Sequence, residues 1–204
     1  MSTPNHVRLA KSAPPTAPSA SPAPVAAPNM ADKKALSVLW QTPERFFVAA
    51  RTVFGGEIAL DPATSADNPA KARRFFTPAD DGLKTDWLPD AKQGVWLNPP
   101  FGKDMKLWLA RVLLYSRQGC PILALLPANR FEQGYIHEFL GEANTVLFVR
   151  KRVSFIDPAT KTPAKGNIYP SMLVGMGVDP MLFKSAFDGF GLRLAVRSDG
   201  NQPG

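Results

Sequence analysis

Four consecutive residues near the middle of the chain, Asn98-Pro99-Pro100-Phe101, could activate a planar amine such as the exocyclic amine of a base. The lone pair of such an amine is delocalised, and acceptors aimed at both of its N–H groups draw the nitrogen towards a tetrahedral state. The Asn98 side-chain oxygen and the Pro99 carbonyl are two such acceptors, and both stay available because proline has no N–H and disfavours helical angles in the preceding residue. Phe101 adds an apolar face on which a base can stack.

The same residues could instead form a simple turn, because Asn-Pro often starts turns and Phe101-Gly102 could end a loop before a helix. The catalytic interpretation requires a strand before the motif and a helix after it. Residues 94–97 have the apolar pattern of a short strand, and residues 107–115 repeat apolar side chains at helical spacing. This context favours catalysis, but the motif alone does not choose DNA over another amine or amide.

The elements around the motif predict an α/β domain with a mostly parallel sheet and antiparallel strands added at one edge. In such sheets ligands bind beyond the carboxyl ends of the strands, which is where Asp61, Asn98 and Asn129-Arg130 are expected. Thr42 is predicted to cap the first helix, with Pro43 at its first position. Strands are predicted at residues 58–60, 94–97, 121–126, 145–149, 153–156, 171–178 and 192–196, and helices at 43–54, 107–115 and 131–140.

The N-terminal part of the chain differs in composition from the rest. Residues 12–28 alternate proline with alanine, serine and threonine, a composition that buries little apolar area and stays extended. We therefore expect a disordered tail over residues 1–34 and one folded domain over residues 35–200.

Composition narrows the possible partners of the chain. The 204 residues carry a formal net charge of +7, which suits a polyanion without identifying one. Cys120 is the single cysteine and cannot form an internal disulfide; with only His6 and His137 beside it, we predict no metal site. No apolar run approaches the ~20 residues of a membrane span and the N-terminus does not resemble a secretory signal, so we predict no membrane partner and a cytoplasmic location.

Several blocks of the sequence, from about Trp40 to the last predicted strands, resemble the phage-type DNA N-6-adenine methyltransferases, a Dam-like family. The resemblance implies a Rossmann-like methyltransferase fold, S-adenosylmethionine as cofactor and N6 of adenine in DNA as acceptor, in a bacterial or phage-infected cell where restriction and modification systems operate. The blocks occur in the family's order: Trp40-Gln41-Thr42-Pro43, Leu60-Asp61-Pro62-Ala63-Thr64-Ser65, Phe75-Phe76-Thr77, Asp80-Asp81-Gly82-Leu83 with Asp86-Trp87, residues 95–101, and Leu126-Pro127-Ala128.

The resemblance also implies roles for individual residues. The motif Asn98-Pro99-Pro100-Phe101 would be catalytic: Asn98 and Pro99 hold the amine, and Phe101 stacks the flipped adenine. Asp61, with Pro62 and Ala63, would lie near the methionine part of the cofactor, and Asp81 near its adenosine part. The turn after Leu60 departs from the glycine-rich turn usual in larger amino-methyltransferases. An Asp-Pro turn that only ends a strand remains the alternative for Asp61, and Asp81 and Asp86 could also be structural.

Basic residues that follow the predicted strands are candidates for DNA contacts. Arg130, Arg150, Lys151 and Arg152 could neutralise phosphates on either side of an extruded base, or form a solvated basic face. Asn129 could pair with a base edge. The loop with Lys161, Lys165 and Asn167 is the expected place of target recognition, because so short a chain has no room for a separate recognition domain.

Two other functions stay open on the sequence alone. A methyltransferase of this kind could act on an RNA base or on a glutamine amide of a protein, since each offers a planar amine that needs the same activation. The chain could also be a non-catalytic DNA-binding protein on a degenerate methyltransferase fold. The sequence does not predict the target site or the oligomeric state.

Overall fold

The computed structural model describes residues 40–164 and 167–195. The predicted tail, residues 1–34, and Lys165 lie outside the described residues. None of the helices within the described ranges is long and apolar enough to cross a membrane.

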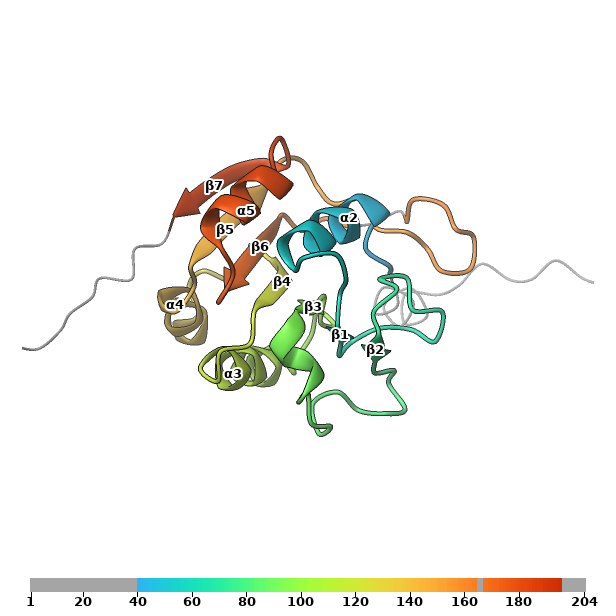
Figure 1. The fold of residues 1–204 in the computed structure, drawn as a ribbon. Helices are drawn as coiled ribbons and strands as arrows, with labels where there is room; N and C mark the ends of the chain where they lie inside the picture. The colour runs from blue at the N-terminus through green and yellow to red at the C-terminus, as the bar shows by residue number, and fades with distance from the viewer. Residues whose placement is uncertain (1–39, 165–166, 196–204) are drawn as a thin grey trace, which may run out of the picture.

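A seven-stranded sheet with the order β2-β1-β3-β4-β6-β5-β7 forms the centre of the fold (Figure 1). The first four strands in this order are parallel, whereas β6 pairs antiparallel with both β4 and β5, and β7 pairs antiparallel with β5. The predicted α/β sheet is confirmed, although antiparallel β6 lies inside the sheet rather than at its edge. The strands are β1 (Leu60–Asp61), β2 (Arg74–Phe75), β3 (Val95–Leu97), β4 (Ile122–Pro127), β5 (Thr145–Val149), β6 (Ser171–Met176) and β7 (Gly191–Ala195).

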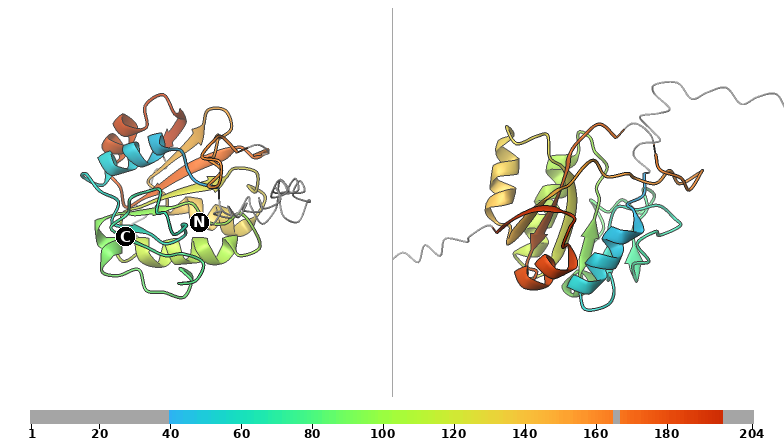
Figure 2. Two further views of the ribbon diagram at one scale, coloured as in Figure 1. Left: turned by 90° about the vertical axis from the view of Figure 1, so that its right-hand side faces the viewer. Right: turned by 90° about the horizontal axis from the view of Figure 1, so that it is seen from above.

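Helices cover both faces of the sheet, because the buried strands carry apolar side chains on both sides. On one face α3 (Met105–Ser116) and α4 (Gly134–Gly141) pack with Val95 and Leu97; on the other, α2 (Glu44–Val53) and α5 (Pro180–Ala186) pack with Trp96. Figure 2 shows α2 and α4 on opposite sides of the sheet. The result is a domain of three layers, with the sheet between two layers of helices.

The predicted strand at residues 153–156 is wrong. Val153 and Phe155 are buried and Ser154 is exposed, which produces the alternating pattern of a strand. Within the described ranges, the backbone there forms only isolated bridges, from Ile156 to Gln41 and to Pro163. The alternation arises because Val153 and Phe155 pack into the core under α2.

The first helix begins one residue later than predicted. Its N-cap is Pro43, whose own side chain makes no capping hydrogen bond. Thr42 is 5% exposed, and its side chain contributes to the wall of a cleft instead of capping the helix.

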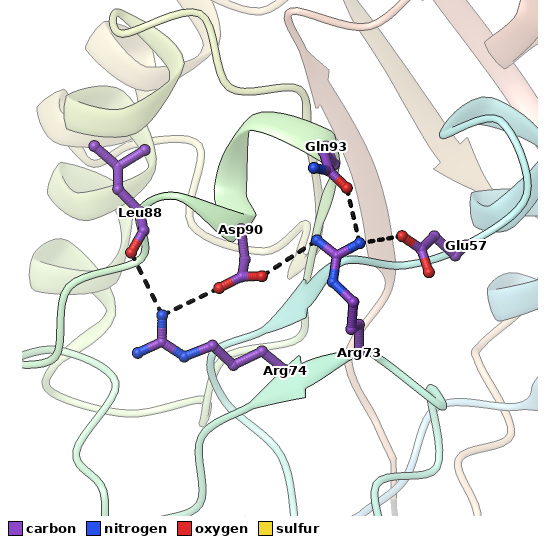
Figure 3. A network of polar contacts seen from close by, with 6 residues as sticks. All are labelled: Glu57, Arg73, Arg74, Leu88, Asp90 and Gln93. Carbon is purple, nitrogen blue, oxygen red and sulfur yellow. Dashed lines mark hydrogen bonds and ion pairs between the residues drawn. The ribbon is translucent and has the colours of Figure 1, made fainter.

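A network of charged side chains fastens the edge strand β2 to the short helix η1 (Asp90–Gln93) (Figure 3). Asp90 accepts from Arg73 at 3.2 Å and from Arg74 at 3.1 Å, and Arg73 also binds Glu57 and, at 2.8 Å, Gln93. Burial of Asp90 acts to raise its pKa, but the two arginines outweigh burial and hold the pKa below its usual range. The network matters for the site because the loop after β2 forms one wall of the cleft.

Candidate active site

A cleft of about 200 Å³ opens at the carboxyl ends of β1 and β3. Its walls come from the segment 40–42 before α2, the loop 61–65 after β1, the loop after β2, and the residues that follow β3. Trp96 from the sheet and Trp108 from α3 also line it, so the cleft draws on both faces of the sheet. The carboxyl ends of the parallel strands are where a ligand was expected from the order of the elements.

The cleft brings together residues that the sequence analysis assigned to two different partners. All four predicted cofactor residues contribute to its walls, and so do Asn98 and Pro100 of the catalytic motif. Pro99 is buried and does not line the cleft, while Phe101 packs edge-on against Phe155 with ring centroids 6.3 Å apart. The cofactor residues concerned are Asp61, Pro62, Ala63 and Asp81.

The side chain of Asn98 has an unused acceptor. Its Oδ1 is buried and has no hydrogen-bond partner within the part of the chain that the structure describes. A buried polar atom without a partner costs about 1–3 kcal/mol, so a ligand that supplies a hydrogen-bond donor at this position would be stabilised. A donor that enters the cleft, such as an amine N–H, would satisfy it.

Asp61 is a buried carboxyl that lines the same cleft. It is 3% exposed, and its Oδ1 accepts from the Ala63 N–H at 3.2 Å. Burial raises the pKa of Asp61 from 3.8 to about 7, although the Ala63 N–H and the Thr64 hydroxyl act to lower it. Because burial disfavours the charged form, a cationic ligand in the cleft would favour the carboxylate.

Asp81 and Gly82 line the cleft where the loop after β2 meets the loop after β1. Asp81 has a positive φ of 51°, and its carboxylate pairs with Lys84 at 2.8 Å, a contact that lowers the pKa of Asp81. A Cβ at Gly82 would lie 1.9 Å from the Pro62 carbonyl oxygen. The turn after β1 contains no glycine, and the close backbone approach in this cleft uses a glycine from the neighbouring loop.

A cluster of polar and aromatic side chains fixes the position of Gly82 through a hydrogen bond to its carbonyl. The Trp87 Nε1–H donates to the Gly82 carbonyl at 2.9 Å, and the Trp87 ring stacks on Tyr115 with centroids 4.8 Å apart. The Tyr115 hydroxyl accepts from the Trp87 N–H at 3.0 Å and donates to Asp86 at 2.8 Å. Asp86 therefore stabilises the wall and does not line the cleft.

Several residues of the cleft were not predicted as site residues, among them Gly82, Trp96 and Trp108 and the segment Trp40, Gln41 and Thr42. Gln41 is 8% exposed and donates to Asp67 at 2.6 Å, while Trp40 stacks on Phe155 with centroids 6.2 Å apart. A signal was present for the segment 40–42, since it belongs to the first block that resembles the Dam-like family.

The sequence also matches a family description, DNA N-6-adenine-methyltransferase (Dam), over residues 30–181, more than half of the chain. The chain belongs to the DNA N-6-adenine-methyltransferase (Dam) family. The matched range includes the whole cleft, and the α/β sheet agrees with the methyltransferase fold that the resemblance implied. Among curated proteins, no sequence matches this Dam-family chain.

The residues predicted to contact DNA do not line the cleft. They follow the carboxyl ends of β4 and β5, on the same side of the sheet as the cleft. Asn129 and Arg130 follow β4 and are exposed. Arg150 and Arg152 follow β5, which runs in the same direction as β4, and are also exposed. The Arg152 Nε–H donates to the Ile168 carbonyl at 3.1 Å.

Two of the residues expected in target recognition have partners within the chain. Lys161 pairs with Asp67 at 2.8 Å, and the Asn167 amide donates to the Val153 carbonyl at 2.9 Å. Lys161 thus ties its loop to the rim of the cleft. Among the described residues, no group of three or more His, Cys, Asp or Glu side chains could hold a metal ion.

Proposed function

We propose that this Dam-family chain transfers a methyl group from S-adenosylmethionine to N6 of an adenine extruded from DNA, at specific sites. The observation that supports this most strongly is the buried, unpartnered Asn98 Oδ1 in a cleft that also contains Asp61 and Asp81. The Asn98 oxygen could accept a hydrogen bond from an amine, and the two carboxyls that line the same cleft could bind a cationic cofactor.

The residues of the cleft fit the cofactor. S-adenosylmethionine, when bound, supplies a methyl group made electrophilic by a sulfonium. Asp61, with Pro62 and Ala63, would hold the methionine part, because a buried carboxyl suits a cation better than a neutral ligand. The more exposed Asp81 would bind the adenosine part.

The catalytic motif acts on the acceptor. Asn98 Oδ1, which lines the cleft, would accept a hydrogen bond from one N–H group of N6. The Pro99 carbonyl, from a residue that is buried beside the cleft, would accept from the other, and the two bonds would make the nitrogen more nucleophilic. Pro100 keeps the Pro99 carbonyl out of a helical turn, and Phe101 offers its ring to the extruded base. The methylated amine is a weak base and releases its proton to solvent, so the proposal assigns no general base.

The exposed edge beside the cleft would bind DNA. Arg130, Arg150 and Arg152 would neutralise phosphates, and Asn129 would lie close enough to the nucleic acid to contact a base edge. Their exposure and shared edge support this assignment.

The direct test is transfer of labelled methyl groups. The protein is incubated with labelled S-adenosylmethionine and, separately, plasmid DNA, RNA or protein, and modified bases in the plasmid are mapped by single-molecule sequencing. We expect label in DNA, at N6 of adenines within one short sequence. Label in RNA or protein but not in DNA would contradict the proposed acceptor, and absence of both label and cofactor binding would contradict an enzyme.

A further inference from the structure

Two consecutive apolar side chains are exposed close to the catalytic motif. Ile168 is 64% exposed and Tyr169 is 43% exposed. Exposed apolar side chains are common on protein surfaces, and it is the position of this pair near the catalytic motif that makes it a candidate for contact with another molecule. We call residues 167–169 the apolar tip.

The apolar tip is built into the structure by side-chain hydrogen bonds. The Asn167 amide donates to the Val153 carbonyl at 2.9 Å, and its oxygen accepts from the Tyr169 N–H at 3.2 Å. Arg152 donates to the Ile168 carbonyl at 3.1 Å. Residues 152 and 153 therefore hold the tip in place and leave its two apolar side chains free to contact another molecule.

The tip also has a defined position relative to the catalytic motif. It precedes β6, whose first residue, Ser171, pairs with Pro127 at the carboxyl end of β4. The motif follows β3, the neighbour of β4 on the other side, so about two strand spacings, roughly 10 Å, separate them along this edge. Phe155, two residues after Val153, contacts the Phe101 ring.

The surroundings of the tip are positively charged. Arg150, Lys151 and Arg152 are exposed after β5, and Arg130 is exposed after β4. Apolar side chains flanked by cations suit a nucleic acid, whose phosphates meet the cations while its bases meet the apolar groups.

On this basis we propose that Ile168 and Tyr169 form a wedge that enters duplex DNA and occupies the space left by the extruded adenine. The inference rests on the proposed function, and it adds positioning residues that stabilise the extruded state. The wedge replaces part of the stacking lost when the base leaves the helix. Its contribution should therefore depend on how costly extrusion is, and that cost is lowest for an unpaired base.

The test compares two DNA duplexes that differ only opposite the target adenine, which faces thymine in one and an abasic site in the other. For Tyr169→Ala and Ile168→Ala, kcat/KM should fall about tenfold on the paired duplex and less than about twofold on the abasic duplex. Tyr169→Phe keeps the ring and should behave like the unmodified protein. Met181→Ala is the matched control, because Met181 is 68% exposed but lies on α5, beyond the other end of β6.

A second readout does not depend on methyl transfer. With 2-aminopurine in place of the target adenine, the unmodified protein should raise its fluorescence in the paired duplex, and Tyr169→Ala should raise it less at saturating protein. Equal losses of activity on the two duplexes, or no loss on the paired one, would overturn the wedge. Failure of the proposed function would look different, because the unmodified protein would then methylate neither duplex.

Discussion

Asp61 is the residue whose ionisation should control cofactor affinity. Its folded-state pKa of about 7 lies above its ordinary value of 3.8, so ionising it costs the folded protein stability as pH rises between these values. The neutral Asp61 side chain therefore contributes stability that is fully present below pH 3.8 and is lost once the pH passes about 7. A cationic ligand acts in the opposite direction, because it stabilises the carboxylate.

We therefore expect the affinity for S-adenosylmethionine, measured by calorimetry, to rise as pH increases from 5 to 7 and to level off above that range. Asp61→Asn should bind the cofactor more weakly and lose this dependence. It should also melt a few degrees higher than the unmodified protein at pH 8, since it no longer buries a charge. An affinity that is unchanged in Asp61→Asn would remove Asp61 from the cofactor site.

At the scale of elements, the cleft depends on the contact between the loop after β1 and the loop after β2. At Gly82 the two backbones are so close that there is no room for a side chain. Gly82→Ala would place a Cβ 1.9 Å from the Pro62 carbonyl oxygen, so one loop has to move. We expect cofactor affinity to fall at least about tenfold and the melting temperature to drop, as for other overpacked sites. Gly141→Ala at the end of α4 is the control, because a Cβ there meets no atom of the described residues within 4 Å. Similar effects of the two substitutions would show that the contact with Pro62 is unimportant.

The loop that contains Gly82 follows strand β2, and Asp90 stabilises this strand through its ion pairs with Arg73 and Arg74. Because its folded-state pKa is depressed, Asp90 contributes stability that is present above the unfolded pKa and lost as pH falls through the folded one. Asp90→Asn should lower the free energy of unfolding by about 0.5–1 kcal/mol at pH 7, since the arginines are partly exposed. Denaturant titrations should show this difference shrinking below about pH 4. A difference that does not vary with pH would contradict the role of the charge.

Elements with a strong local pattern were predictable, and those with a misleading or short pattern were not. The strand over residues 145–149 has the predicted bounds. Residues 153–156 were wrongly assigned because burial alternates there without strand pairing. The helix α5 was missed although Asp179 and Pro180 form a helix start, with Asp179 accepting from two backbone N–H groups. Strand β2 has only two residues, too few to show a period.

For the molecule as a whole, the strand order explains why part of the site was predictable. Asp61 and Asn98 end neighbouring parallel strands, so their meeting at one edge follows from the order of elements. The contributions of Trp40 and Gly82 to the cleft depend on how loops fold over that edge, which no periodicity encodes. The pairing of Lys161 with Asp67 was equally inaccessible, since the two residues lie far apart in the chain.

The net charge of +7 and the exposed cations at this edge predict DNA binding that weakens with salt. For Arg150→Ala, the slope of log K against log salt should decrease in magnitude by about 1, because one phosphate contact is lost. Lys184→Ala, on α5 beyond the other end of β6, should leave the slope unchanged. Fluorescence anisotropy with a short duplex measures both, and an equal change in the two variants would indicate a diffuse charge effect.

The central claim is that Asn98 acts on the acceptor amine. Asn144 is a matched control, because its Oδ1 is also buried without a partner among the described residues, yet it precedes β5 at the opposite edge of the sheet. The decisive measurement is single-turnover methyl transfer to DNA, with cofactor affinity measured in parallel. We predict that Asn98→Ala loses at least about a hundredfold in rate while its cofactor affinity stays within about twofold, and that Asn144→Ala keeps both. A rate of Asn98→Ala equal to that of Asn144→Ala, or a loss of cofactor affinity as large as its loss of rate, would contradict the account.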